Sequence, residues 1–202
     1  PIFSRMVSEK WDGLSVIYVC PLKALLNNLH QRLSHYAGFV GRTCEVWHGD
    51  VSTSRKDNIR DTPPDILLTT PESLEGMLVS VNPLGRQMLG TARVVVVDEI
   101  HAFAGDDRGW HLLSVLERVT RIACRELQRI GLSATVGNPD VLLAWATGHC
   151  AGEREVVSPP VAEAKPPEVT LDYVGSLENA ALVISRLHRG EKRLVFCDSR
   201  SR

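Results

Sequence analysis

Residues 94–101 read Val-Val-Val-Val-Asp-Glu-Ile-His, and this stretch decides the fold class. Four consecutive β-branched residues are typical of a strand buried on both faces, as in a parallel α/β sheet. Such sheets place their chemistry at the carboxyl ends of their strands. There, one carboxylate can hold a metal ion while the other positions or deprotonates a water molecule. The alternative is an acidic strand end that caps a helix or solvates a loop. The preceding valines and the following His101 favour the functional interpretation.

The composition is that of an α/β protein with one good core. The 202 residues are 44% hydrophobic, and the formal net charge of -1 neither indicates nor excludes nucleic-acid binding, because a local groove can be basic on a neutral protein. No apolar run is long enough to span a bilayer, so no membrane partner is expected. The five cysteines include no Cys-x-x-Cys pair, which argues against zinc and indicates a reducing compartment, the cytoplasm.

Strand-like and helix-like segments alternate along most of the chain. Strands are expected at residues 15–20, 43–47, 65–70, 94–97 and 127–132. Helices are expected to begin near residues 21, 52, 71, 110 and 139, with a turn at 105–109 before the fourth. This alternation predicts right-handed βαβ crossovers and therefore an α/β fold, a parallel sheet flanked by helices on both faces.

The composition changes near residue 158. Two Pro-Pro pairs predict a semi-rigid linker at 158–168, between a first domain at 1–157 and the start of a second α/β unit at 169–202. That second unit is expected to hold strands near 169–174 and 193–196, with a helix at 177–189. The chain opens on Pro1 rather than Met and closes directly after the last expected strand. We therefore expect a segment of a longer polypeptide, truncated at both ends.

Four of the expected strands end in residues able to do chemistry. In chain order these ends are Cys20 to Lys23, Thr69 to Glu72, Asp98 to His101, and Ser133 to Thr135. The carboxyl ends of parallel strands lie along one edge of a sheet, so the four should meet there. One such motif is weak evidence for a site, whereas four in this order are strong evidence.

These four elements resemble the conserved motifs of superfamily 2 helicases. Residues 21–25 resemble motif Ia, residues 70–72 motif Ib, residues 98–101 the DExH form of motif II (the Walker B element), and residues 133–135 motif III. The segments 101–105, 108–109 and 131–139 are similar to the large-helicase-related (Lhr) family, and residues 194–200 resemble motif IV. The resemblance implies most of a first RecA-like domain and the start of a second.

The resemblance implies ATP and Mg²⁺ as cofactors and gives motif II its roles. Asp98 would hold Mg²⁺ through water, and Glu99 would orient and deprotonate the attacking water. His101 would connect the nucleotide site to motif III, although a packed, hydrogen-bonded histidine is the alternative. Coupling of ATP hydrolysis to movement of the nucleic acid would fall to Ser133, Ala134 and Thr135. Here the alternative, compatible with coupling, is a turn in which the hydroxyls cap the next segment.

The resemblance also implies contacts to a single-stranded or partly duplex nucleic acid, with DNA favoured. Lys23, Thr70 and the backbone near Pro71 would contact phosphates, which need positive charge, hydroxyls and N–H groups. Alone, Lys23 would be interpreted as a solvated residue, and Glu72 as either a helix cap or a functional residue. The segment 48–50 is expected near the same face. The remainder of the polypeptide would be the other partner.

No G-x-x-x-x-G-K-[ST] loop occurs in the 202 residues, and Gly41-Arg42-Thr43 is not a substitute. We therefore expect the parent protein to be an ATP-dependent helicase and this segment alone to be inactive. A nucleotide-free RecA-like lobe that binds nucleic acid or protein is the alternative, although such a scaffold would not need both Asp98 and Glu99. A metal-dependent hydrolase using Asp98, Glu99 and His101 as ligands is disfavoured, because side chains alternate in direction along a strand.

Overall fold

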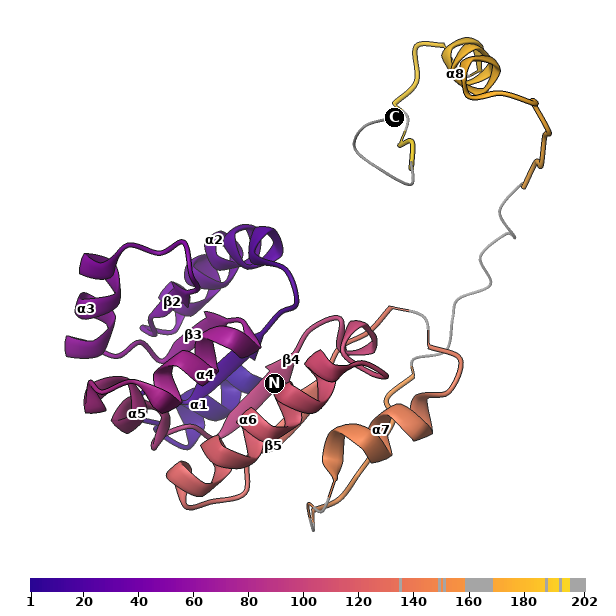
Figure 1. The fold of residues 1–202 in the computed structure, drawn as a ribbon. Helices are drawn as coiled ribbons and strands as arrows, with labels where there is room; N and C mark the ends of the chain where they lie inside the picture. Colours follow the sequence, from indigo (N-terminus) through magenta and orange to yellow (C-terminus); the bar gives the residue numbers. More distant parts are fainter. Residues whose placement is uncertain are drawn as a thin grey trace. The chain divides into compact units, whose positions relative to one another are not determined.

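The computed structural model describes residues 1–134, 136–148, 150, 152–158, 169–187, 189–192 and 194–196. The chain divides into two units, residues 1–157 and residues 158–202, and each is described by itself. Figure 1 shows the first unit as a sheet with helices around it. No helix among the described residues is both long and apolar enough to cross a membrane.

The first unit is built on a five-stranded sheet in which every neighbouring pair is parallel, in the order β2-β3-β1-β4-β5. The strands are β1 (Val16–Val19), β2 (Cys44–Trp47), β3 (Ile66–Thr69), β4 (Val94–Val97) and β5 (Gln128–Gly131). The predicted parallel α/β fold is confirmed. The four valines form β4, and all four are buried.

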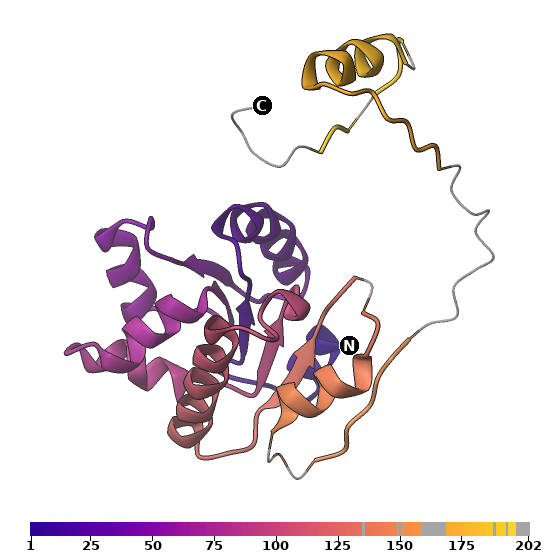
Figure 2. The same ribbon diagram turned by 45° about the vertical axis from the view of Figure 1, so that its right-hand side comes forward.

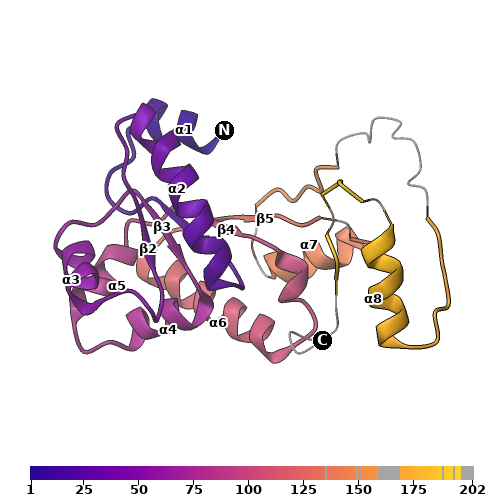
Figure 3. The same ribbon diagram turned by 90° about the horizontal axis from the view of Figure 1, so that it is seen from above.

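Helices cover both faces of the sheet, as expected. Figure 3 shows α1 (Ile2–Ser8) and α2 (Lys23–Phe39) on one side. The other side carries α3 (Thr53–Asp61), α4 (Pro71–Val79), α5 (Pro83–Leu89) and α6 (Asp107–Ala123). In Figure 2, α7 (Pro139–Thr147) lies beside β5, and its Leu142 and Trp145 pack against the core beneath α4 to α6.

Side-chain alternation along each strand divides the interior into two cores. Val94 and Val96 pack with Met6 of α1 and Leu26 of α2. Their neighbours Val95 and Val97 belong to the opposite core, with side chains of α3 to α6. Each fully buried valine contributes about 1.5–3 kcal/mol through loss of apolar surface from water. Because side chains on both faces of this strand pack into an apolar core, no position in it can be polar. This explains the four consecutive valines.

Side-chain caps fix where several helices begin. A cap oxygen accepts a backbone N–H bond in the first turn of α3, α4, α5 and α6, supplied by Ser52, Thr70, Asn82 and Asp106 respectively. Because Asp106 caps α6, this helix starts at Asp107, three residues before the predicted start near residue 110. The expected turn at 105–109 therefore already contains the first turn of a helix.

Three further features differ from the sequence prediction. The short helices α1 and α5 were not predicted. β5 is an edge strand whose residues are exposed or half-buried, and only one side of it is paired in the sheet. In the unit 158–202, α8 (Leu177–Arg186) begins at the predicted residue and ends before the predicted residue 189, and residues 169–174 and 194–196 adopt no strand.

The two missing strands have a physical explanation. A strand needs a hydrogen-bonded neighbour and a covered apolar face, and Leu171 and Tyr173 are both 97% exposed. All but the first residue of the predicted linker at 158–168 lies outside the described residues, as does the last part of the motif IV segment, residues 197–200.

Candidate active site

The strand register brings the predicted motifs to one edge of the sheet. Val19 of β1 lies opposite both Thr69 of β3 and Val97 of β4, and Val97 lies opposite Gly131 of β5. The next residue of each strand therefore leaves the sheet at the same level. This arrangement places motifs Ia, Ib, II and III side by side, as the sequence predicted.

Asp98 is held in place through both of its carboxylate oxygens. The hydroxyl of Tyr18 donates to Oδ2 over 2.8 Å, and the backbone N–H of Glu99 donates to Oδ1 over 2.9 Å. The backbone N–H of Asp98 donates to the carbonyl of Val19, so the β1–β4 ladder extends to this residue. The carboxylate is thus oriented by the sheet itself.

Tyr18 is a site residue that the sequence did not identify. Burial raises the pKa of its phenol, and the hydrogen bond to Asp98 raises it further. Tyr18 therefore remains a neutral donor at physiological pH. A tyrosine within an apolar strand is ordinarily a packing residue, so only the proximity of Asp98 in space reveals its role.

Glu99 has a left-handed backbone conformation, with φ 48° and ψ 44°. Non-glycine residues adopt this conformation at a cost of about 1–3 kcal/mol, and such strain concentrates at functional sites. The turn ends the strand and opens a short 3-10 helix, η1 (Ile100–Ala102). It breaks the alternation of the strand and allows the Glu99 side chain to approach that of His101.

His101 connects motif II to motif III. Its Nδ1 atom lies 2.7 Å from Oγ of Ser133, and its Nε2 atom lies 3.5 Å from Oε2 of Glu99. The histidine is exposed rather than packed in the core, and it is hydrogen-bonded, as the alternative of a packed, hydrogen-bonded histidine also expects. Ala134 is exposed beside this chain of contacts, and Thr135 lies outside the described residues.

The donor set at this edge suits a hydrated magnesium ion. A carboxylate has about four acceptor sites, and the hydrogen bonds above occupy two of those of Asp98. Mg²⁺ commonly takes one or two carboxylates and fills its other positions with water and phosphate oxygens. Within the described part of the chain, no group of three or more His, Cys, Asp and Glu side chains could form a complete protein cage for a metal.

Lys23 is paired rather than free. Its Nζ lies 2.8 Å from Oδ1 of Asp50, and this hydrogen bond is the main cause that lowers the pKa of the Asp50 carboxyl. His48 beside them is buried, where Nε2 lies 3.2 Å from Oδ1 of Asn27. Burial lowers the pKa of His48, so it is neutral at pH 7. The segment 48–50 therefore lies against Lys23, the lysine that is predicted to contact nucleic acid.

Thr70 and Pro71 form the start of α4. The Thr70 side chain is buried and accepts the backbone N–H of Ser73, while Pro71 occupies the first helical position. Glu72 pairs with Arg108 over 2.7 Å. Partial burial raises the pKa of Glu72, but hydrogen bonds from Arg108, from its own backbone and from Thr70 outweigh burial and lower it overall. The Thr70 hydroxyl is thus already engaged in capping.

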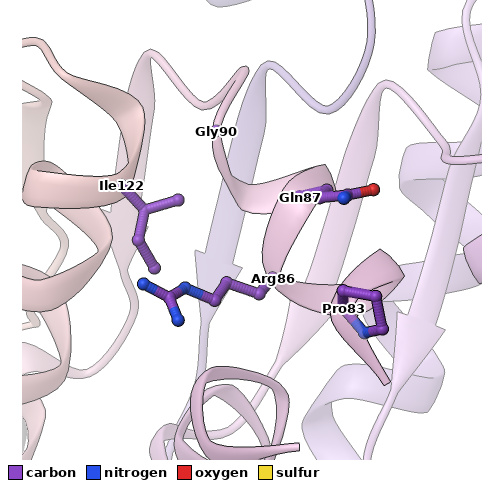
Figure 4. A pocket seen from close by; sticks show the side chains of 5 residues that line it. All are labelled: Pro83, Arg86, Gln87, Gly90 and Ile122. Carbon is purple, nitrogen blue, oxygen red and sulfur yellow. The ribbon is translucent and has the colours of Figure 1, made fainter. Parts of the chain in front are cut away.

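A surface cavity of about 510 Å³ lies away from these motifs (Figure 4). Residues of α5 line one side of it and Ile122 of α6 the other, and Arg86 extends toward it in the close view. Its lining includes no carboxylate and none of the four strand ends. The candidate site is therefore an open edge of the sheet rather than this cavity.

The RecA-like sheet and its edge of aligned motifs define the motor domain of a helicase. The family profile for DEAD/DEAH box helicases matches residues 1–142, and the chain belongs to that family. Within superfamily 2 it is Lhr-like. It is 32% identical, over 95% of its length, to the Lhr helicase and probable uracil glycosylase of Mycolicibacterium smegmatis. It is 36% identical, over 82% of its length, to the ATP-dependent helicase Lhr-Core of Methanothermobacter thermautotrophicus.

A solved structure agrees with these relatives. Mycobacterium smegmatis helicase Lhr, bound to single-stranded DNA and AMP-PNP, matches with a TM-score of 0.61 and 38% identity. The match covers 68% of this chain and 19% of that one. The chain spans 14% of the M. smegmatis relative and 20% of the archaeal relative in the sequence comparison.

Proposed function

We propose that this chain is the part of an ATP-dependent helicase or translocase motor that carries motif II and contacts single-stranded nucleic acid. The observation that carries the proposal is the chain of contacts from Glu99 through His101 to Ser133, at the sheet edge of a DEAD/DEAH box family member. In our proposal residues 1–157 belong to the first RecA-like domain, 158–168 to a linker and 169–202 to the start of a second. The four cysteines among the described residues are free, which fits a reducing compartment such as the cytoplasm.

Motif II would act on the nucleotide through two carboxylates with different duties. Asp98, fixed by Tyr18 and by the Glu99 backbone, would hold Mg²⁺ through water. Glu99 would orient the attacking water and accept its proton. Bound Mg²⁺ would neutralise charge on the ATP phosphates. The positive-φ turn at Glu99 supports this division, because it separates the second carboxylate from the direction of the first.

The neighbouring motifs would link hydrolysis to the strand. His101 and Ser133, joined by a hydrogen bond, would transmit changes at Glu99 to the segment after β5, with Ala134 and Thr135 completing motif III. Lys23 and the backbone at Thr70 and Pro71 would contact phosphates of a single strand, DNA in preference. Since Thr70 already uses its hydroxyl as a helix cap and Pro71 has no N–H, other backbone N–H groups near Pro71 are the expected contacts there.

The test of the assigned base is Glu99→Gln in a longer protein that carries this chain together with a Walker A loop. Nucleic-acid-stimulated ATP turnover should fall at least about 10³-fold while binding of an ATP analogue is retained. Glu45→Gln is the matched control, because Glu45 is similarly exposed and pairs only with Arg55 on the β2 side of the sheet. Retained turnover in Glu99→Gln would reject the assignment.

We propose that residues 1–202 alone bind single-stranded nucleic acid without hydrolysing ATP. The sequence has no Walker A lysine or glycine frame to hold the β- and γ-phosphates. Steady-state ATPase measurements on the purified chain, with and without single-stranded DNA, test this directly. Turnover that is abolished by Glu99→Gln would show that the chain is self-sufficient.

A further inference from the structure

Arg108, in the first turn of α6, contacts two of the four motifs and the segment that follows a third. Its Nε donates to Oε1 of Glu72 over 2.7 Å, and its Nη2 donates to the carbonyl of Pro21 over 3.0 Å. The guanidinium also lies over the ring of Phe103, 5.4 Å from the centroid. Glu72 belongs to motif Ib, Pro21 to motif Ia, and Phe103 follows the motif II segment directly.

The base of this arrangement leaves little room for movement. Gly109 packs so closely against Phe103 that a Cβ at position 109 would overlap the Phe103 carbonyl oxygen. Asp106 caps the same turn by accepting the backbone N–H groups of Arg108 and Gly109. The backbone that carries Arg108 is therefore fixed relative to the segment after Asp98 and Glu99.

The geometry uses a property that only arginine has. A guanidinium donates in two fixed directions in one plane, whereas a lysine ammonium is a single point charge on a flexible stem. Arg108 uses one direction for the Glu72 carboxylate and another for the Pro21 carbonyl. The ion pair is partly exposed, so its net contribution to folding stability is small. What the contacts fix is the spacing between the two loops.

We propose that Arg108 is a positioning residue that sets the distance between the motif Ia and motif Ib loops, and so controls how tightly they hold a single strand. The inference rests on the proposed function, because Lys23 and the backbone at Thr70 and Pro71 are the contacts being positioned. Arg108 itself does not touch the strand. Phosphates repeat at a regular spacing, so two loops contribute fully only when their separation matches that repeat.

The same two helices provide a matched control. Arg118 of α6 donates to both carboxylate oxygens of Glu75 of α4, about three turns along α6 from Arg108. The two arginine side chains are similarly exposed, at 36% and 37%, whereas Glu72 is 53% exposed and Glu75 31%. The Arg118 pair joins α4 and α6 without reaching the Pro21 carbonyl or the strand-end loops.

The experiment measures fluorescence anisotropy of a labelled single-stranded DNA oligonucleotide with the chain of residues 1–202. Glu72→Ala is the decisive variant. Removing a carboxylate near a phosphate-binding loop should tighten binding if electrostatics alone acted. Positioning predicts the opposite sign, a loss of about tenfold in affinity, because Arg108 is no longer held. Glu75→Ala makes the same change in net charge and should leave affinity within about twofold.

Arg108→Lys separates positioning from a direct phosphate contact. It preserves the charge but cannot serve both acceptors, so affinity should fall about tenfold with no change in the salt slope. Arg118→Lys should bind normally, and thermal unfolding checks that each variant is folded. Equal affinities of Arg108→Lys and Arg118→Lys, or tighter binding by Glu72→Ala, would overturn the positioning role of Arg108. The proposed contacts to the DNA strand would remain. Absence of binding by the unmodified chain would instead reject the proposed strand contacts and the inference with them.

Discussion

The Nδ1 atom of His101 lies 2.7 Å from the Oγ atom of Ser133, which joins the loop after β4 to the segment after β5. The parallel register of Val97 with Gly131 carries both residues past the edge of the sheet. The backbone N–H of Ile100 donates to the carbonyl of Leu132 and closes the gap between them. Two strands thus deliver the two side chains to one hydrogen bond, and Glu99 lies at its far end.

This relationship predicts an uncoupling phenotype. In a longer protein with a Walker A loop, His101→Ala or Ser133→Ala should lower nucleic-acid-stimulated ATP turnover about tenfold while affinity for single-stranded DNA stays unchanged, because neither side chain is among the proposed phosphate contacts. The double variant should be little worse than either single one, since both remove the same hydrogen bond.

His111→Ala is the control for that prediction. His111 of α6 also lies 3.5 Å from a glutamate, Glu75, but outside the sheet edge. Turnover and stimulation should match the unmodified protein. Additive losses in the double variant at positions 101 and 133 would show that the two residues act separately.

The sheet edge could be predicted from sequence because strand ends carry their own signals. The four valines at 94–97 predict a buried strand, and Asp98 follows it directly. Tyr18 could not be predicted in the same way. It is separated from Asp98 by 80 positions, and its partner is set by the β1–β4 register, which the pattern of either strand alone does not specify. Arg108 and Glu72, 36 positions apart, present the same difficulty.

Errors in the predicted elements have a related origin. Residues 169–174 have a strand-like composition, but strand formation depends on a neighbour that those residues do not supply. The start of α6 was placed too late because Gly105 and Gly109 suggested a turn, whereas the Asp106 cap and the packing of Gly109 on Phe103 determine the helix. Local patterns identify apolar runs well, while caps and close approaches depend on the folded surroundings.

Tyr18→Phe tests how Asp98 is held. The folded chain raises the pKa of the Tyr18 phenol through burial and the Asp98 hydrogen bond. Because the folded state binds this proton more tightly than the unfolded state, the stabilisation is fully present below the ordinary tyrosine pKa of about 10 and is lost as pH rises above it. The difference in unfolding free energy between the unmodified chain and Tyr18→Phe should therefore begin to shrink near pH 10 and continue to shrink as pH rises toward the raised pKa of the folded state.

Urea unfolding at a series of pH values measures that difference. Tyr36→Phe, which changes a half-exposed tyrosine on α2, removes the same hydroxyl group away from Asp98 and serves as the control variant. A gap that stays constant for Tyr18→Phe across the alkaline range would mean that folding does not raise the pKa of the Tyr18 phenol.

Asp50→Asn tests whether the ion pair restrains Lys23. The Asp50 carboxylate accepts a hydrogen bond from the Lys23 ammonium, and this bond is the main cause that lowers the pKa of Asp50. Without the carboxylate the ammonium is free for phosphate, so affinity for single-stranded DNA should rise about threefold. The slope of log K against log salt should steepen by up to about 0.7, the value for one added contact on a single strand.

Asp57→Asn makes the same change in net charge on α3, where Asp57 pairs with Arg60. It should alter affinity much less than Asp50→Asn. Equal effects of the two variants would show that only net charge matters, and that Lys23 is not the contact that Asp50 restrains.

Gly109→Ala should destabilise the first unit severely. A Cβ at position 109 would overlap the Phe103 carbonyl oxygen and would lie 2.9 Å from the Trp145 ring, so α6 must shift away from both. The expected loss is about 3 kcal/mol in the free energy of unfolding, the upper part of the range for overpacking. Gly76→Ala is the matched control, because Gly76 is exposed in α4 and a Cβ there meets nothing within 4 Å. Since alanine favours helix over glycine, Gly76→Ala should gain about 0.5–1 kcal/mol. Opposite signs in urea unfolding confirm that close packing on Phe103, rather than helix propensity, requires glycine at position 109; a neutral Gly109→Ala would contradict the close contact on which the placement of Arg108 depends.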